Sequence, residues 1–254
     1  ATESTPQIAL VGKGLTFDAG GYNLKPSGSI EDMKMDMAGS AAVLGAMAAV
    51  SAVKPSYVVH GIVPSSENLV SGAAYKVGDV FRSLNGKTVQ VMNTDAEGRL
   101  ILADALSLAQ RLDPRWVLDA ATLTGAQGVA LGERVAAVLA RHEDRDLADR
   151  VHRAGDATGD LSWVLPLYPH YREQLTSDIA DLKNVGGRMA GTITAAAFLE
   201  AFTRDAAGDP AYPWVHVDLA RPSFLNAAYG YRPKGASGFG VRLLLDALAA
   251  LGEG

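Results

Sequence analysis

Residues 7–21, QIALVGKGLTFDAGG, begin with an apolar run and continue into a stretch rich in glycine. After Gln7, residues 8–11 are apolar on both faces, which is typical of a central strand of a sheet, so we expect a strand over residues 7–11. The glycines that follow allow the backbone to approach closely, but they lack the Gly-x-x-x-x-Gly-Lys-Ser/Thr spacing of a phosphate-binding loop. The stretch therefore predicts a buried strand that ends in a crowded polar loop.

Similar runs alternate with Ala/Leu-rich segments along the chain. The predicted strands are residues 7–11, 57–63, 88–92, 116–120, 135–140 and 214–218. The predicted helices are residues 40–53, 103–112, 145–154, 194–202 and 240–251. Residues 203–213 form the clearest loop. The alternation predicts an α/β layer structure with a mostly parallel or mixed central sheet, which we expect to form one domain over residues 1–254.

The composition limits the classes of function. The 254 residues are 48% hydrophobic and 20% charged, so the chain can bury a full core. The formal net charge of -5 and the lack of a basic block argue against a nucleic-acid partner. Because the sequence contains no cysteine, disulfides and thiolate metal sites are excluded, and any metal must be held by oxygen and nitrogen.

No membrane segment is predicted. The first six residues, ATESTP, lack the basic and apolar regions of a secretory signal. They also lack an initiator methionine, which suggests that the chain was cut from a longer one. Residues 35–53 carry one charge, Asp36, but are rich in Ala and Gly, so we expect a buried, closely packed helix there and not a membrane span.

The stretch 93–100, NTDAEGRL, concentrates charge after the predicted strand 88–92. Ligands bind at the carboxyl ends of strands in α/β sheets. If the segment is extended and the helix begins just after Arg99, then Asp95, Glu97 and Arg99 point to one side. Two interpretations stay open. The acids could favour a helix N-terminus and pair with Arg99, or they could share a bound cation.

Two further acids favour the cation. Asp18 lies in the glycine-rich stretch, and Asp36 lies in 33–37, MKMDM. If Asp18, Asp36, Asp95 and Glu97 converge, they can hold two divalent cations about 3.5–4 Å apart, as in two-metal hydrolytic sites.

Taken together, the chain resembles the catalytic domain of the leucyl aminopeptidase family, the dinuclear-metal cytosol aminopeptidases. The segments that carry the resemblance cover nearly the whole chain: VGKGLTFDAGG, NLKP, MKMDM, ENLVSG, NTDAEGRL, DAATLTGA, SDIADLKN, GTITAAAFL and GASGFGVR. NTDAEGRL at this separation from VGKGLTFD is highly specific. The resemblance implies a three-layer α/β/α sandwich with a mixed, mostly parallel central sheet, similar to zinc exopeptidases.

The resemblance also implies two divalent cations per subunit, zinc or manganese, with magnesium or cobalt as alternatives. The tighter site would use Lys13, Asp18, Asp36 and Glu97, and the exchangeable site would use Asp18, Asp95 and Glu97. Lys13 would bind as a neutral amine, because a nearby dication disfavours its protonated form.

The implied activity is hydrolysis of the N-terminal bond of peptides and amino-acid amides, with a leucine-type preference. The nucleophile would be a water activated by both metals, with Lys25 stabilising the oxyanion and Arg99 holding a bicarbonate that shuttles the proton. By motif position, the substrate site would be lined by Met33, Asn93, Thr122, Leu123 and Gly125. For Met33 and Thr122, ordinary core packing is an equal alternative.

Family members carry an N-terminal α/β domain that is absent from this chain, and full-length relatives assemble as homo-hexamers. The resemblance therefore implies a cytoplasmic enzyme whose partners are peptides with a free N-terminus, without a membrane or a nucleic acid. One departure concerns residues 218–222, DLARP, where the family often has an Asp-Ile-Ala-Gly-like run. Arg221 could narrow or recharge the substrate pocket.

Two other functions compete with this interpretation. The first is a nucleic-acid-binding or scaffolding role on the same fold, against which the acidic balance argues. The second is a different two-metal hydrolase that cuts acylated amino acids or phosphoesters. Such sites commonly use histidine ligands, and the histidines here show no ligand spacing. Asp119, inside a predicted strand, is expected to be a satisfied core acid.

Overall fold

The computed structural model describes residues 5–252, and its centre is a six-stranded sheet. In spatial order the strands are β3 (Val58–Ile62), β1 (Gln7–Gly12), β7 (Trp116–Ala121), β11 (Trp214–Asp218), β8 (Ala136–Ala140) and β9 (Ser162–Val164). The first four are mutually parallel, β8 is antiparallel to β11, and β9 is parallel to β8. The predicted mixed, mostly parallel sheet is confirmed.

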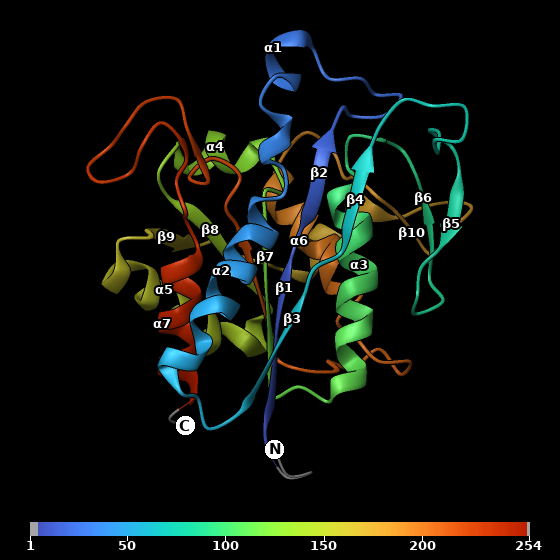
Figure 1. Ribbon diagram of the computed structural model, residues 1–254. Coiled ribbons are helices and arrows are strands. Elements are labelled where there is room, and N and C mark those ends of the chain that lie inside the picture. Colours follow the sequence, from blue (N-terminus) through green and yellow to red (C-terminus); the bar gives the residue numbers. More distant parts are fainter. Residues whose placement is uncertain (1–4, 253–254) are drawn as a thin grey trace.

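Helices cover both faces of this sheet, which gives the three predicted layers (Figure 1). One face carries α2 (Ala38–Val53), α5 (Arg145–Thr158) and α7 (Val241–Gly252), and the other carries α3 (Gly98–Ala109) and α6 (Gly191–Glu200) with α4 (Gly125–Leu131) packed on α6. Adjacent residues of β7 show why the central strands carry apolar residues on both faces. Val117 lies in the core under α3 and α6, whereas Leu118 lies in the core under α2 and α7.

The remaining elements are short and lie around the sheet. They are β2 (Gly14–Asp18), α1 (Ser27–Ile30), η1 (Met33–Met35), β4 (Ser65–Asn68), β5 (Val80–Arg82), β6 (Thr88–Gln90), η2 (Gln110–Leu112), η3 (His142–Asp144), η4 (Pro169–Leu175), β10 (Leu182–Lys183), β12 (Phe224–Leu225) and β13 (Gly235–Ala236). β2 pairs with β4 and extends the line of β1 toward the top of the molecule in Figure 1.

Two expectations about residues 88–112 were wrong in detail. The strand predicted at 88–92 is β6, which belongs to a separate three-stranded sheet with β5 and β10 and not to the central one. The helix predicted to begin after Arg99 begins at Gly98. The pattern of apolar residues is the same for a short strand of a small side sheet and for a strand of the central sheet, so it could not distinguish the two. The signal prediction for the N-terminus falls partly on residues 1–4, which lie outside the described residues.

Within residues 5–252, one helical stretch, Ser27–Ala52, is long and apolar enough to cross a membrane. It is made of α1, η1 and α2. α2 packs against β1, β7 and α7, and it buries Ala42, Val43 and Ala46 in the core. Residues 35–53 thus contain the closely packed helix that the sequence predicted.

Two glycines allow the start of α2 to cross the carboxyl ends of β1 and β7. A Cβ atom on Gly39 would lie 2.1 Å from the carbonyl oxygen of Ala120, and one on Gly12 would lie 2.7 Å from the carbonyl oxygen of Gly39. In this crossing the backbone N–H of Ser40 donates to the carbonyl oxygen of Lys13 at 2.8 Å. Backbone contact at this point sets the distance between Lys13 and the residues that precede α2.

Replacing Gly39 with alanine is expected to lower the free energy of unfolding by about 1–3 kcal/mol, because the added methyl group must displace the backbone of β7. Gly28→Ala in α1 is the matched control, since a Cβ there would have no neighbour within 4 Å. Urea unfolding followed by circular dichroism would measure both. Equal stability of Gly39→Ala and the wild type would contradict the close crossing.

Candidate metal centre

A cavity of about 400 Å³ lies beyond the carboxyl ends of β1 and β7. Ten of the twelve predicted site residues line it: Lys13, Asp18, Lys25, Met33, Asp36, Asp95, Glu97, Thr122, Leu123 and Gly125. The other two, Asn93 and Arg99, are not among its lining residues. Three separate parts of the chain, residues 13–36, 95–97 and 122–125, therefore meet at this edge of the sheet.

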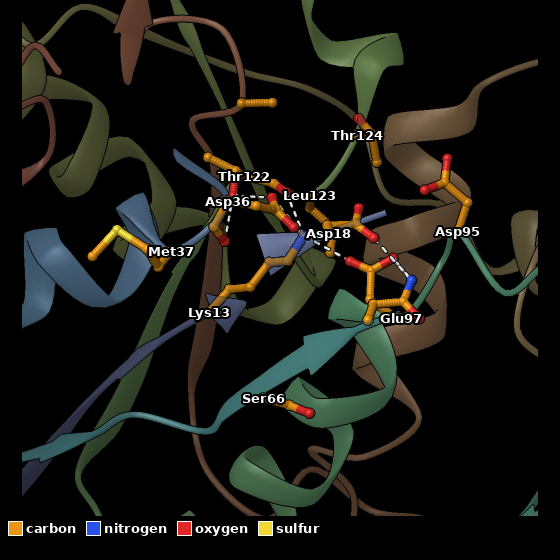
Figure 2. Close-up of polar contacts among 12 residues, drawn as sticks. Lys13, Asp18, Asp36, Met37, Ser66, Asp95, Glu97, Thr122, Leu123 and Thr124 are labelled. Carbon is orange, nitrogen blue, oxygen red and sulfur yellow. Dashed lines mark hydrogen bonds and ion pairs between the residues drawn. The ribbon is translucent and has the colours of Figure 1, made fainter. Parts of the chain in front are cut away.

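Lys13 lies at the centre of the buried part of this cluster (Figure 2). It follows β1 directly, and its side chain is 4% exposed. The ammonium lies 2.7 Å from Oδ2 of Asp36 and 3.0 Å from Oε1 of Glu97, and it donates to the carbonyl oxygen of Thr122 at 2.8 Å. Gly98 makes room for it, since a Cβ there would lie 2.4 Å from Cε of Lys13.

Lys25 joins a second pair of carboxylates. Its ammonium lies 2.8 Å from Oδ2 of Asp18 and 2.5 Å from Oδ1 of Asp95. The backbone turns back before Lys25 at Gly20, whose φ of +88° places it in the region that favours glycine. Each of the two lysines therefore bridges two of the four acids.

The donor atoms fit a divalent metal. One carboxylate oxygen from each of Asp18, Asp36 and Glu97 can be chosen so that all three lie within 4.8 Å of one another, and all three residues are buried. Two oxygens, Oδ2 of Asp36 and Oδ1 of Asp95, are buried and receive no well-directed hydrogen bond from the described part of the chain, although each lies beside one of the lysine ammonium groups. Clustered, under-satisfied carboxylate oxygens beside an amine form an oxygen and nitrogen donor set for a dication.

The electrostatics point the same way. Burial raises the pKa of Asp36 to about 6, although the Lys13 ammonium opposes this shift. Burial likewise raises the pKa of Asp95 to about 6 against the effect of Lys25. Burial opposes the charge of Lys13, but Asp36 and Glu97 outweigh it and raise the pKa of this lysine. Four carboxylates share two ammonium groups, so additional positive charge would stabilise the ionised acids.

Because the Lys13 ammonium must release its proton before its nitrogen can coordinate a metal, the ion pairs of Lys13 and coordination by Lys13 are alternative states of the site. The predicted neutral amine at this position stays a prediction.

The segment after β7 is held in place by a buried acid that the sequence did not single out. Oδ1 of Asp218, at the end of β11, accepts the backbone N–H of Leu123 at 3.1 Å, and Oδ2 accepts the hydroxyl of Thr124 at 2.6 Å. Thr122 donates its hydroxyl to Oδ1 of Asp36 at 2.7 Å. Thr122 therefore contacts Asp36 in the cavity and is not part of the apolar core.

The predicted extended arrangement of Asp95, Glu97 and Arg99 was wrong. Glu97 already has helical backbone angles, φ -75° and ψ -37°, and Arg99 lies in the first turn of α3. Asp95 and Glu97 still reach the cavity, because residues 93–96 form a turn in which Oδ1 of Asn93 accepts the N–H of Asp95 at 2.8 Å. Asn93 is thus placed to shape the turn, outside the cavity lining.

Arg99 is buried behind the acids. Its Nη1 donates to the carbonyl oxygen of Asn184 at 2.7 Å, and its Nε has no hydrogen-bond partner among residues 5–252. Burial lowers the pKa of Arg99 to about 10, so the guanidinium keeps its charge at neutral pH. Glu97 pairs with Lys13, and Asp95 pairs with Lys25. Among the described residues, Arg99 therefore forms no ion pair with either acid.

Two asparagines that the sequence analysis did not name support these turns. Nδ2 of Asn68 donates to Oδ1 of Asp18 at 2.8 Å and to the carbonyl oxygen of Thr94 at 2.9 Å. Oδ1 of Asn184 accepts the N–H of Met92 at 2.8 Å. Asn68 lies in ENLVSG and Asn184 in SDIADLKN, two of the segments that carried the family resemblance. Membership in these segments was the sequence signal that could have identified both asparagines.

Asp119 is a satisfied core acid, as predicted. It accepts hydrogen bonds from Nε1 of Trp214 at 2.7 Å and shares one with Nδ1 of His216 at 2.6 Å. Both Asp119 and His216 are fully buried. The pairing with Asp119 accounts for Nδ1 of the buried His216 ring.

Comparison with known proteins gives consistent results. The family model described as cytosol aminopeptidase family, catalytic domain, matches residues 1–245. Two relatives named probable cytosol aminopeptidase are similar to this chain. The one from Roseiflexus castenholzii is 49% identical over 244 residues, 96% of this chain and 48% of the relative. The one from Geobacter sulfurreducens is 52% identical over 241 residues, 95% of this chain and 47% of the relative.

Solved structures of the bottromycin maturation enzyme BotP share the fold, with a TM-score of 0.89 at 42% identity over 98% of this chain and 53% of that one. The BotP complex with Mn has a TM-score of 0.91 at 41% identity, over 99% of this chain and 55% of that one. The chain spans about half the length of the relatives that it matches. From these matches and from the converging site, we conclude that the chain belongs to the cytosol aminopeptidase family.

Proposed function

We propose that residues 1–254 form the catalytic domain of a metal-dependent aminopeptidase, which hydrolyses the N-terminal bond of peptides and amino-acid amides. The observation that carries the proposal is the convergence of Asp18, Asp36 and Glu97 around the Lys13 side chain, in a cavity large enough for a short peptide. Family membership supports the same reaction.

Two divalent cations would be held by residues that the cavity already brings together. Lys13, Asp18, Asp36 and Glu97 would form the tighter site, and Asp18, Asp95 and Glu97 the exchangeable one. The exposure of the acids supports this order, since the Asp95 side chain is 30% exposed and the Asp36 side chain 6%. Bound metals would supply an activated water and polarise the scissile carbonyl group. The Mn complex of BotP supports manganese, with zinc, magnesium and cobalt as alternatives.

The chain's own residues would orient the substrate. Lys25 lies at the cavity wall with its ammonium between Asp18 and Asp95, from where it could stabilise negative charge on the carbonyl oxygen. The free α-amine of the substrate would lie near Asp95, the most exposed of the four acids. A blocked amine could not make this contact, which is the physical reason to expect exopeptidase action.

Arg99 is the proposed anchor for a bicarbonate that would supply a base near the reacting water. Among the described residues that line the cavity there is no histidine, and the carboxylates Asp18, Asp36, Asp95 and Glu97 would be engaged as metal ligands, so we assign the base to a bicarbonate. The unpaired, buried Nε of Arg99 leaves a donor for a planar oxyanion.

The leucine-type preference, the cytoplasmic location and the hexameric assembly are part of the same proposal. Met33 and Leu123, which line the cavity, are apolar surfaces for an aliphatic side chain. Relatives named cytosol aminopeptidase support the location. Faster cleavage of other amino-acid amides than of leucine amide would contradict the leucine-type preference. Cell fractionation that finds the protein outside the cytoplasm would contradict the location, and light scattering that gives a mass other than that of six chains would contradict the hexamer.

Hydrolysis of leucine amide and of N-acetyl-leucine amide tests the function directly. After loading with zinc or manganese, the chain is expected to cleave the free-amine substrate alone. A chelator should abolish cleavage, and added metal should restore it. Cleavage of the acetylated substrate at a similar rate, or full activity in chelator, would refute the proposal.

Glu97→Gln is expected to reduce bound metal below two equivalents per chain and to lower turnover by at least about a hundredfold, since a lost ligand costs more than a lost outer partner. Metal content by mass spectrometry and turnover of leucine amide would be measured together. Glu133→Gln is the matched control, because Glu133 is exposed and lies outside the cavity lining. A fully metallated and fully active Glu97→Gln variant would remove Glu97 from the ligand set.

Arg99→Ala is expected to lower turnover about a hundredfold, the usual size of a lost general base, while two metals stay bound. Wild-type turnover should also fall in bicarbonate-depleted buffer, whereas the variant should no longer respond to bicarbonate. Arg111→Ala, at an exposed arginine on the far end of the α3 region, serves as control. Wild-type rates that do not depend on bicarbonate would count against this role.

A further inference from the structure

Arg221 is a cation of the cavity wall whose guanidinium has no partner among the described residues. Lys13 and Lys25 are each paired with two carboxylates. Arg221 lines the same cavity and is exposed, and within residues 5–252 its guanidinium forms no hydrogen bond and no ion pair. Asp32, an exposed acid of the same lining, is not paired with it either.

The backbone of Arg221 is nevertheless held firmly. Its N–H donates to Oε1 of Gln127 at 3.0 Å. Gln127 is fully buried, and its Nε2 donates to the carbonyl oxygen of Val135 at 2.6 Å. A buried amide that joins α4, the start of β8 and the segment after β11 therefore fixes the point from which the Arg221 side chain leaves the backbone.

The side chain itself lies against α4 at Gly128. A Cβ atom built on Gly128 would lie 2.4 Å from Cγ of Arg221 and 2.9 Å from its Nε. The aliphatic part of the arginine thus occupies the space that a larger residue at position 128 would fill. Nε of Arg221 therefore lies beside α4 at the cavity wall, and the exposed end of the side chain is accessible to a molecule in the cavity.

A guanidinium in this position recognises a planar anion, because its N–H groups match a carboxylate in two parallel hydrogen bonds. Apart from Asp32, the other charged groups of the cavity are four acids paired with two lysines, a set that suits an amine and metal ions. A molecule that contacts both parts must carry an amine at one place and a carboxylate at another.

We propose that Arg221 binds a carboxylate of the peptide substrate, so that this chain prefers acidic peptides to their neutral isosteres. The inference rests on the proposed aminopeptidase function. Three carboxylates could fill the role: the side chain of the first residue, the side chain of the second residue, or the terminal carboxylate of a dipeptide.

Three pairs of substrates, each differing by a carboxylate or an amide, separate these sources. They are Glu-Leu amide against Gln-Leu amide, Leu-Glu amide against Leu-Gln amide, and Leu-Ala against Leu-Ala amide. With the metal-loaded chain, kcat/KM is expected to favour the carboxylate in one pair by roughly five- to tenfold, the size of a charge-assisted contact that solvent partly screens. Raising the ionic strength should reduce the ratio.

The variants test whether Arg221 causes the preference. Arg221→Gln should bring the ratio to about one, and Arg221→Lys should keep part of it because the charge is retained. Gly128→Ala should also reduce the ratio, since the added methyl group would displace the arginine without removing its charge. Arg111→Gln is the control and should leave the ratio unchanged.

The outcomes distinguish the two proposals. Cleavage of the neutral peptides supports the aminopeptidase function whatever Arg221 does. A ratio near one in all three pairs, or a preference that persists in Arg221→Gln, would overturn the role of Arg221 alone. If the metal-loaded chain cleaves no free-amine peptide, the proposed function fails and the inference fails with it.

Discussion

Negative charge buried in a small volume is the constraint on which the rest of the site depends. Four carboxylates meet at the carboxyl edge of the central sheet, and burial raises the pKa of two of them, Asp36 and Asp95, to about 6. Such a cluster is stable only if positive charge lies between its members. Lys13 and Lys25 provide such charge, each between two acids. Divalent cations would relieve the same repulsion and leave the lysines for other contacts.

The fold brings these groups together through backbone contact. Gly12 and Gly39 let α2 cross the ends of β1 and β7 at a distance that no side chain would allow, and Gly98 leaves space for the Lys13 side chain. Buried amides and acids behind the cavity, including Asn68 and Asp218, hold the turns that present the acids. The charged cluster is therefore positioned by rigid elements and by satisfied hydrogen bonds, which is what a metal site requires.

Family membership bears on the reaction that the chain catalyses, whereas the lining of the cavity bears on the substrate that it prefers. Membership in the cytosol aminopeptidase family supports the proposed aminopeptidase reaction. The convergence of Asp18, Asp36 and Glu97 in the cavity supports it independently. Substrate choice depends on the walls of the cavity, where Arg221 is held over Gly128 by a backbone contact to Gln127. Because the guanidinium of Arg221 has no partner within residues 5–252, we infer that the chain selects peptides with a carboxylate.

Sequence alone determined the layer class of the fold and the identity of ten residues that line the cavity, because strands apolar on both faces and highly specific motifs are local signals. Other features depended on tertiary structure. The strand at 88–92 joined a side sheet, and the start of α3 at Gly98 turned Arg99 behind the acids and left Asn93 in the supporting turn. Only packing between distant segments decides such placements, since a short strand or a helix start is compatible with several neighbours until backbone hydrogen bonds and glycine contacts select one.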